Sequence, residues 1–139
     1  MGVRRKAREC AVQMLFQYDM SGGAVADVPA KFWAMNSQAA EVMEFANQLF
    51  SGTVARLAEI DNSIRAHATN WRMDRMAAVD RNVLRLAVYE LVADVTPKAV
   101  VINEALEIAK KFSTDESAHF VNGILDSIKN FLNKKAVNC

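Results

Sequence analysis

Residues 77–128 have the sequence AAVDRNVLRLAVYELVADVTPKAVVINEALEIAKKFSTDESAHFVNGILDSI, and they are the core-forming half of the chain. Apolar residues recur three or four positions apart through this stretch, which is the spacing of a buried helix face. Thr96 and Pro97 match a helix cap and a first-turn proline, while Ser113 and Glu116 match a capping box. We therefore predict three consecutive helices, near residues 76–95, 97–112 and 114–132.

A first helix is predicted over residues 3–20, ended by Gly22 and Gly23. One side of it is a continuous apolar stripe, made of Ala7, Cys10, Ala11, Met14 and Tyr18. Val12 and Phe16 fall on the opposite side, among charged residues. Either another helix covers these two side chains, or they form a partner-binding strip.

The middle of the chain has a less regular pattern. A short helix is predicted near residues 27–36, with three large apolar residues in the core: Phe32, Trp33 and Met35. One long helix is predicted over 38–66, in which Gly52 indicates a bend or a close helix crossing. A turn and a short helical piece follow at 67–75, where we expect Trp71 to anchor on the core rather than stack on a base.

The composition favours an all-helical domain. Only five glycines and two prolines occur in 139 residues, and strong helix formers are plentiful. With 52% hydrophobic and 24% charged residues, the chain is typical of a soluble globular protein of one domain. The two distant cysteines, Cys10 and Cys139, and the lack of a long apolar run indicate a cytoplasmic protein that does not enter a membrane.

The sequence offers few residues for catalysis. Its two histidines, His67 and His119, are far apart and fall in no metal-ligand spacing, so we expect no metal and no cofactor. A nucleophile pair of Cys10 and His119 remains open, although Cys10 falls in an apolar stripe, where thiols are usually inert. We expect a protein that is not an enzyme.

A cluster of positive charge at the start of the chain contrasts with a net charge of only +1. The basic arm consists of Arg4, Arg5, Lys6 and Arg8. Such an arm either binds nucleic-acid phosphates or is simply solvated. Phe120, at the edge of the last helix, supports the first interpretation if it lies near the arm, because exposed aromatic rings stack unpaired bases.

Two residues interrupt the apolar faces of residues 77–128. Asp80 lies in line with Leu84 and Leu91, so its carboxylate needs a partner, either an arginine of the chain or another molecule. Gly123 stands in the middle of a predicted helix, which indicates the close approach of another helix or of a ligand.

Two segments of the chain closely resemble the NusB family of bacterial transcription antitermination factors. They are VRRKARECAVQMLFQYD at residues 3–19 and DRNVLRLAVYEL…TPKAVVINEALEIAKKF…ESAHFVNGILDSI within residues 80–128. The strings INEA and FVNG, with their spacing, are the most specific parts. Residues 21–76 match the family only in length and helical character.

The resemblance implies an all-α fold, a compact bundle of about seven helices in a single domain (1–139). Two helical subdomains, at about 1–75 and 76–139, would share one core. It also implies a non-catalytic adaptor that pairs with the ribosomal protein NusE. The pair would bind single-stranded boxA RNA and help RNA polymerase, in the transcription elongation complex, to resist termination, chiefly on ribosomal RNA operons.

The same resemblance assigns roles to individual residues. The RNA-binding residues would be Arg4, Arg5, Lys6, Arg8 and Gln13 of the first helix, with Glu116, Ser117 and Phe120 of the last. Phe16 and Asp80 match positions used toward NusE, and Val12 would join them as part of the same strip. His119 stands where some relatives carry lysine, which departs from the family pattern.

Two alternatives remain at this point. One is an RNA-independent homodimeric scaffold, because some members of the family form homodimers that hide the RNA face. The other is a stand-alone relative of the RNA-binding domain of ribosomal RNA cytosine methyltransferases. In those enzymes the RNA-binding domain is followed by a cofactor-binding α/β domain.

Overall fold

The computed structural model describes residues 2–137, and within that range it contains seven α-helices, one 3-10 helix and no strand. The elements are α1 (Val3–Ser21), α2 (Asp27–Met35), α3 (Ala40–Ala55), α4 (Leu57–His67), η1 (Met73–Arg75), α5 (Ala78–Ala93), α6 (Lys98–Phe112) and α7 (Asp115–Val137). The predicted all-α fold of about seven helices is confirmed. None of these helices is long and apolar enough to cross a lipid bilayer. Cys139 lies outside the described residues.

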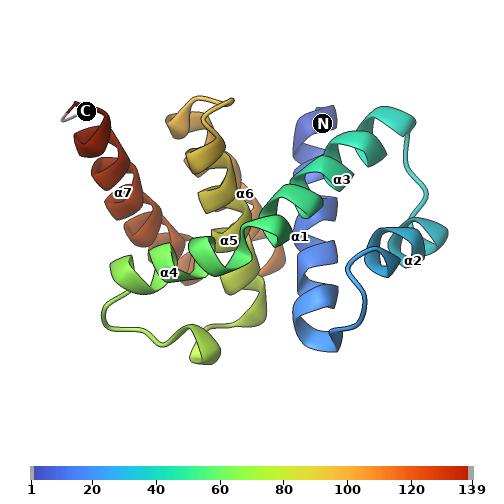
Figure 1. Cartoon of the computed structure of the whole chain (residues 1–139), viewed down its shortest axis with the longest axis horizontal. Coiled ribbons are helices and arrows are strands. Elements are labelled where there is room, and N and C mark those ends of the chain that lie inside the picture. Colours follow the sequence, from blue (N-terminus) through green and yellow to red (C-terminus); the bar gives the residue numbers. More distant parts are fainter. Residues whose placement is uncertain (1, 138–139) are drawn as a thin grey trace.

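Helix α5 is the centre of the molecule, as its nearly continuous apolar surface predicted. It contacts α1 and α3 on one side and α4, α6 and α7 on the other (Figure 1). Its side chains Val83, Leu84, Val88 and Leu91 are all within the fully buried core. Helices α6 and α7 pack together as a hairpin, and α3 crosses α1 on the opposite side of α5.

The prediction of one long helix over 38–66 is wrong. The helical hydrogen bonding is interrupted at Arg56, whose backbone (φ −116°, ψ 22°) separates α3 from α4. Gly52 does not cause this break. A Cβ atom there would overlap the ring of Tyr89 on α5, so the glycine permits a close helix crossing, one of the two roles predicted for it.

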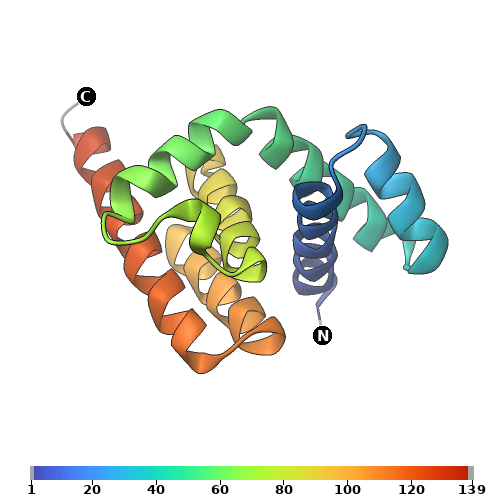
Figure 2. The same ribbon diagram turned by 90° about the horizontal axis from the view of Figure 1, so that it is seen from below.

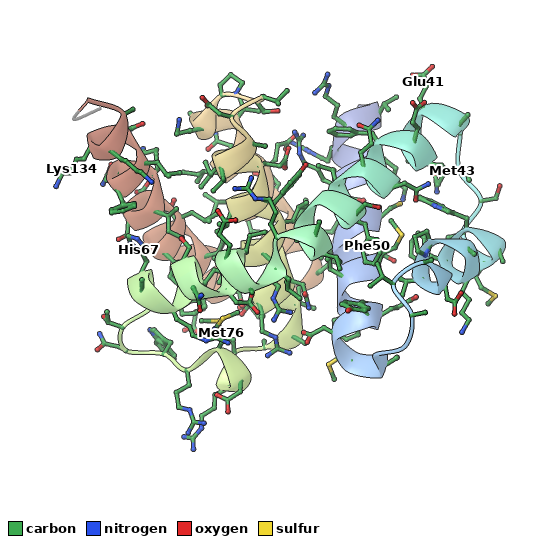
Figure 3. The ribbon with its side chains drawn as sticks, viewed as in Figure 1. Glu41, Met43, Phe50, His67, Met76 and Lys134 are labelled. Atoms are coloured by element: carbon green, nitrogen blue, oxygen red, sulfur yellow. The ribbon has the colours of Figure 1, made fainter. Side chains whose placement is uncertain are left out.

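Phe50, labelled in Figure 3, lies within the α1–α3 crossing. Its ring is fully buried and meets the ring of Tyr18 edge to face, with 6.2 Å between ring centroids. Aromatic pairs of this kind contribute about 0.5–1.5 kcal/mol beyond the area they bury. The crossing therefore fixes the position of α1, on which the basic arm lies.

Not every large apolar residue lies in the core as expected. Phe32 is buried, and Trp33 is half-buried with its indole N–H donating to Asn47 Oδ1 at 2.8 Å. Met35 is 84% exposed and Trp71 is 61% exposed, so the prediction that both belong to the core is wrong. Met35 is the last residue of α2, and Trp71 lies in the segment between α4 and η1, so neither is at a position where two helices pack together.

The helix ends also differ from the predicted caps. Helix α7 is capped by Thr114, whose Oγ1 accepts a hydrogen bond from the Ser117 N–H at 3.0 Å, so the capping box from Ser113 to Glu116 is wrong by one residue. Helix α6 begins at Lys98 without the expected side-chain cap from Thr96. Gly123 faces open space, which excludes the close approach of another helix of this chain among the described residues.

Candidate nucleic-acid interface

The start of α1 presents three positive side chains to solvent. Arg4 is exposed, and its guanidinium lies over the ring of Phe45 at 5.4 Å from the centroid. Arg5 is partly exposed and pairs with Glu104 of α6, with 2.9 Å between Nε and Oε2. Lys6 is partly exposed and lies 4.0 Å from Glu9. These three cations are available at the surface, although Arg5 already has an acidic partner.

Arg8 does not belong to this exposed set. It is 2% exposed and forms two hydrogen bonds with Glu90 of α5, each 2.9 Å long. Its other guanidinium nitrogen lies 3.9 Å from Glu104. The prediction that Arg8 lies at the RNA-binding surface is therefore corrected. Its side chain is held in a buried ion pair between α1 and α5.

A line of contacts connects α1 to the α6–α7 turn. Glu9 is 2% exposed, and its carboxylate accepts a hydrogen bond from Lys111 Nζ at 3.0 Å. Lys111 and its exposed neighbour Lys110 form the last turn of α6, just before the residue that caps α7. Figure 2 shows the start of α1 and the α6–α7 turn at the same side of the molecule. Gln13, half-buried on α1, donates from Nε2 to the Glu9 carbonyl at 3.4 Å.

The start of α7 borders an open hollow of about 330 Å³. Glu116, Ser117 and Phe120 line one wall, as the resemblance grouped them. The other wall comes from the segment between α4 and α5 and contains Trp71, Arg75, Met76 and Ala77. Met76, labelled in Figure 3, is buried at this end of the molecule.

Asp80 lines the same hollow and is only 7% exposed. Its Oδ2 accepts a hydrogen bond from the Ser117 hydroxyl at 3.0 Å. Its Oδ1 is buried and has no hydrogen-bond partner among the described residues. Of the two partners considered for Asp80, the arginine of this chain does not hold, because Arg81 pairs with Asp19 at 2.7 Å and Arg85 pairs with Asp61 at 2.8 Å.

A second ion-pair cluster consists of Asp19, Asp61, Arg81 and Arg85. Within it, Asp19 joins the end of α1 to α5. Burial on its own raises the pKa of the Asp19 carboxyl. Hydrogen bonds from Arg81 and Asn82, together with the charges of Arg85 and Arg81, outweigh burial and lower the pKa below its usual range. The carboxylate therefore stabilises the junction of α1 and α5 while it is ionised.

The two apolar residues of the predicted partner-binding strip have different surroundings. Val12 is 3% exposed and packs against α5 and α6, beside Val83, Leu86 and Ala105. The expectation that Val12 contacts a partner is therefore wrong for this fold, and the alternative that helices cover it holds. Phe16, one turn later, is 36% exposed and remains accessible.

The residues considered for catalysis are not arranged as an active site. Cys10 is buried, and burial raises the pKa of its thiol, so the reactive thiolate is disfavoured. His119 is exposed on α7. His67 forms a 2.7 Å hydrogen bond through Nδ1 with the Ser127 hydroxyl. Among residues 2–137, no group of three His, Cys, Asp or Glu side chains is placed to hold a metal ion.

Sequence reasoning missed several residues of this surface. Trp71 was assigned to the core, yet its ring meets Phe120 at 5.1 Å between centroids, beside the hollow. Lys110 and Lys111 were not among the predicted binding residues. Two positive charges beside the α7 cap were the available signal, whereas nothing in the sequence indicated that Trp71 approaches Phe120.

The chain is similar in sequence and in fold to known proteins of one family. A family model described as the NusB family matches residues 5–130. The transcription antitermination protein NusB of Koribacter versatilis is 53% identical over 129 residues, which are 91% of this chain and 88% of the relative. The structure of T. maritima NusB superposes with a TM-score of 0.83 at 36% identity, covering 91% of this chain and 90% of the other. A chain from the crystal structure of the antitermination factors NusB and NusE in complex with double-stranded RNA gives a TM-score of 0.84 at 29% identity, covering 94% and 98%.

Proposed function

The chain belongs to the NusB family, and on that premise we propose that it acts as a transcription antitermination factor that binds boxA-type RNA together with the ribosomal protein NusE. The proposed role is that of an adaptor and requires no chemical step. The observation that carries it is the presence of exposed cations at the start of α1 and the end of α6, together with a hollow lined by two aromatic rings at the start of α7.

The cations account for attraction to the RNA backbone. Arg4, Arg5 and Lys6 lie at the start of α1, and Lys110 and Lys111 lie at the end of α6. Each phosphate contact releases counterions, which makes the affinity depend on salt with a slope of about 0.7 per contact for a single strand. A strand that passes from α1 to the α6–α7 turn meets both groups.

The hollow accounts for contact with bases. Single-stranded RNA exposes its bases, and proteins commonly hold them by stacking on aromatic side chains. Phe120 and Trp71 provide such rings, and Ser117 provides a hydroxyl beside them. Glu116 is exposed at the rim, where its carboxylate repels phosphates and favours donor groups of bases.

Phe16 is the proposed contact for the protein partner. It is the accessible aromatic residue of α1, and a related NusB is known in complex with NusE. The resemblance also assigned Asp80 to this partner. Asp80 is nearly buried at the wall of the hollow, where one carboxylate oxygen accepts the hydrogen bond from Ser117 and the other has no partner among the described residues. We propose further that the complex acts within the elongating RNA polymerase assembly, and that a homodimer, where it forms, competes with RNA.

Fluorescence anisotropy with labelled RNA tests this function. We expect boxA RNA to bind more tightly than a scrambled RNA of equal length, and more tightly still when NusE is added. Combined Arg4→Ala and Lys6→Ala replacements should lower the salt slope by about 1.4, because each of the two phosphate contacts that they remove contributes about 0.7. Lys31→Ala, at an exposed position of α2 away from this side, is the matched control and should leave the slope unchanged.

Equal binding of both RNAs, with and without NusE, would contradict the proposal. Light scattering then tests whether the protein is instead a homodimer that does not respond to RNA. A dimer whose mass does not change when RNA is added would support an RNA-independent scaffold.

A further inference from the structure

Two arginines of the basic arm lie over the ring of Phe45, which belongs to α3. The guanidinium carbon of Arg4 is 5.4 Å from the centroid of this ring, and that of Arg8 is 5.7 Å from it. A cation this close to an aromatic face is attracted by the negative charge density of the face. The same ring therefore contacts one cation that faces solvent and one that is buried.

The ring of Phe45 is held in place by its surroundings. It is half-buried and packs against the hydrophobic core, and Leu49, one turn later on α3, is buried. Arg8 is fixed by two hydrogen bonds with Glu90, so its position over the ring is set by α5. The ring is therefore a fixed surface beside the start of α1.

Arg4 differs from the other exposed cations of the basic arm. Arg5 pairs with Glu104, and Lys6 lies 4.0 Å from Glu9. Arg4 has no ion-pair partner within 4.0 Å among residues 2–137. The contact with the aromatic ring is what holds its guanidinium, and the N–H donors of the guanidinium remain available to a phosphate.

Two carboxylates of this chain can compete for Arg4. Glu41, labelled in Figure 3, and Glu44 are exposed in the first two turns of α3. Together with Arg4 and Phe45 they line an open groove of about 360 Å³. An arginine side chain that leaves the ring can pair with either carboxylate across this groove, and a phosphate must then displace that carboxylate before it can bind.

We propose that Phe45 is a positioning residue for RNA: its ring holds the guanidinium of Arg4 in place, away from Glu41 and Glu44, for a phosphate of the RNA backbone. This inference rests on the proposed RNA-binding function and adds a residue that acts through Arg4. Phe45 itself does not contact the RNA. A cation that is already in its binding position avoids part of the cost of ordering a long side chain.

The strength of the contact determines the size of the effect. At an exposed site, a contact between a cation and an aromatic ring favours the held position by a factor of about two to five. The apparent affinity falls in proportion to the fraction of molecules in which Arg4 is held. Loss of the aromatic face should therefore weaken RNA binding roughly twofold to fivefold.

The test is a double-mutant cycle with labelled boxA RNA, measured by fluorescence anisotropy at low salt. Phe45→Leu keeps an apolar side chain and removes the aromatic face, so RNA binding should weaken roughly twofold to fivefold. In an Arg4→Ala background the same replacement should have no effect, because the residue through which Phe45 acts is gone. Phe45→Tyr restores an aromatic face and should bind RNA as tightly as the parent protein.

Two further measurements distinguish positioning from a general structural role. Glu41→Gln combined with Glu44→Gln removes the competing carboxylates, so Phe45→Leu should cost less affinity in that background. In NMR spectra of the free protein, Phe45→Leu should shift the side-chain N–H signal of Arg4, because the ring current is lost.

The matched control is Phe131→Leu. It removes an exposed ring of α7 over which no arginine or lysine lies among the described residues. RNA affinity should be unchanged in this variant. Circular dichroism spectra that match the parent protein confirm that each variant is folded.

Equal losses of affinity from Phe45→Leu in the parent and in the Arg4→Ala background would overturn the proposal, because the ring would then not act through Arg4. A folded Phe45→Leu variant that binds RNA as tightly as the parent would also overturn it. The RNA-binding function stands in both cases. If the parent protein does not bind boxA RNA at any salt concentration, with or without NusE, the proposed function fails and this inference fails with it.

Discussion

Replacing Arg8 by alanine should destabilise the fold rather than weaken RNA binding directly. The guanidinium makes two 2.9 Å hydrogen bonds with Glu90, and the two side chains are only 3% and 7% exposed. Removal of one partner leaves the other charge buried and uncompensated, which costs about 3–5 kcal/mol. Since small domains are stable by about 5–15 kcal/mol, this loss is a large part of the total.

Urea unfolding followed by circular dichroism measures this effect. Arg4→Ala is the matched control, because Arg4 lies on the same helix and is exposed, so its free energy of unfolding should change by less than about 0.5 kcal/mol. The double variant with Arg8→Met and Glu90→Leu should recover most of the loss, because it removes both charges and keeps the volume filled.

The opposite pattern would refute this reasoning. If Arg8→Ala costs less than about 1 kcal/mol, the value typical of a surface ion pair, and at the same time abolishes RNA binding, then Arg8 contacts phosphate. The assignment from the family resemblance would then be right and the structural role wrong.

Three further changes have defined outcomes. Glu104→Gln releases Arg5 from its ion pair, so RNA affinity at low salt should rise roughly twofold to fivefold in an anisotropy titration. Gly52→Ala should lower the free energy of unfolding by about 1–2 kcal/mol, because the cost of the overlap with Tyr89 exceeds the gain in helix propensity. In a Tyr89→Leu background, which removes the overlap, the same change should be stabilising. The depressed pKa of Asp19 contributes stability above its unfolded value of about 3.9, which is lost as pH falls through the folded value. Asp19→Asn should therefore be less stable at pH 7 and lose less stability on acid titration, and an equal acid response in both proteins would contradict this.

Periodicity was enough to predict most of the fold. The central position of α5 followed from apolar residues on nearly all of its faces, and the end of α1 followed from glycine punctuation. The α3–α4 break could not be predicted, because Arg56 and Leu57, at the break, are both good helix formers.

The site was harder to predict than the fold. Arg4 and Arg8 lie one turn apart on the same face of α1, and both guanidinium groups lie over the ring of Phe45, so the spacing could not show that only Arg8 is buried against Glu90. Trp71 was assigned to the core on hydrophobicity alone, which cannot distinguish a buried ring from one at the rim of a hollow. The pairing of Asp80 with Ser117 depends on residues 37 positions apart in sequence, which only the three-dimensional structure brings together.

Amide chemical-shift mapping by NMR tests the central claim most directly, namely that RNA follows one side of the molecule from the start of α1 to the hollow. When boxA RNA is added, we expect the largest changes at residues 3–6, 71–76 and 110–120, with α2 and the exposed face of α3 unchanged. Changes that cluster on α2 and α3, and leave the α6–α7 turn unaffected, would contradict the account.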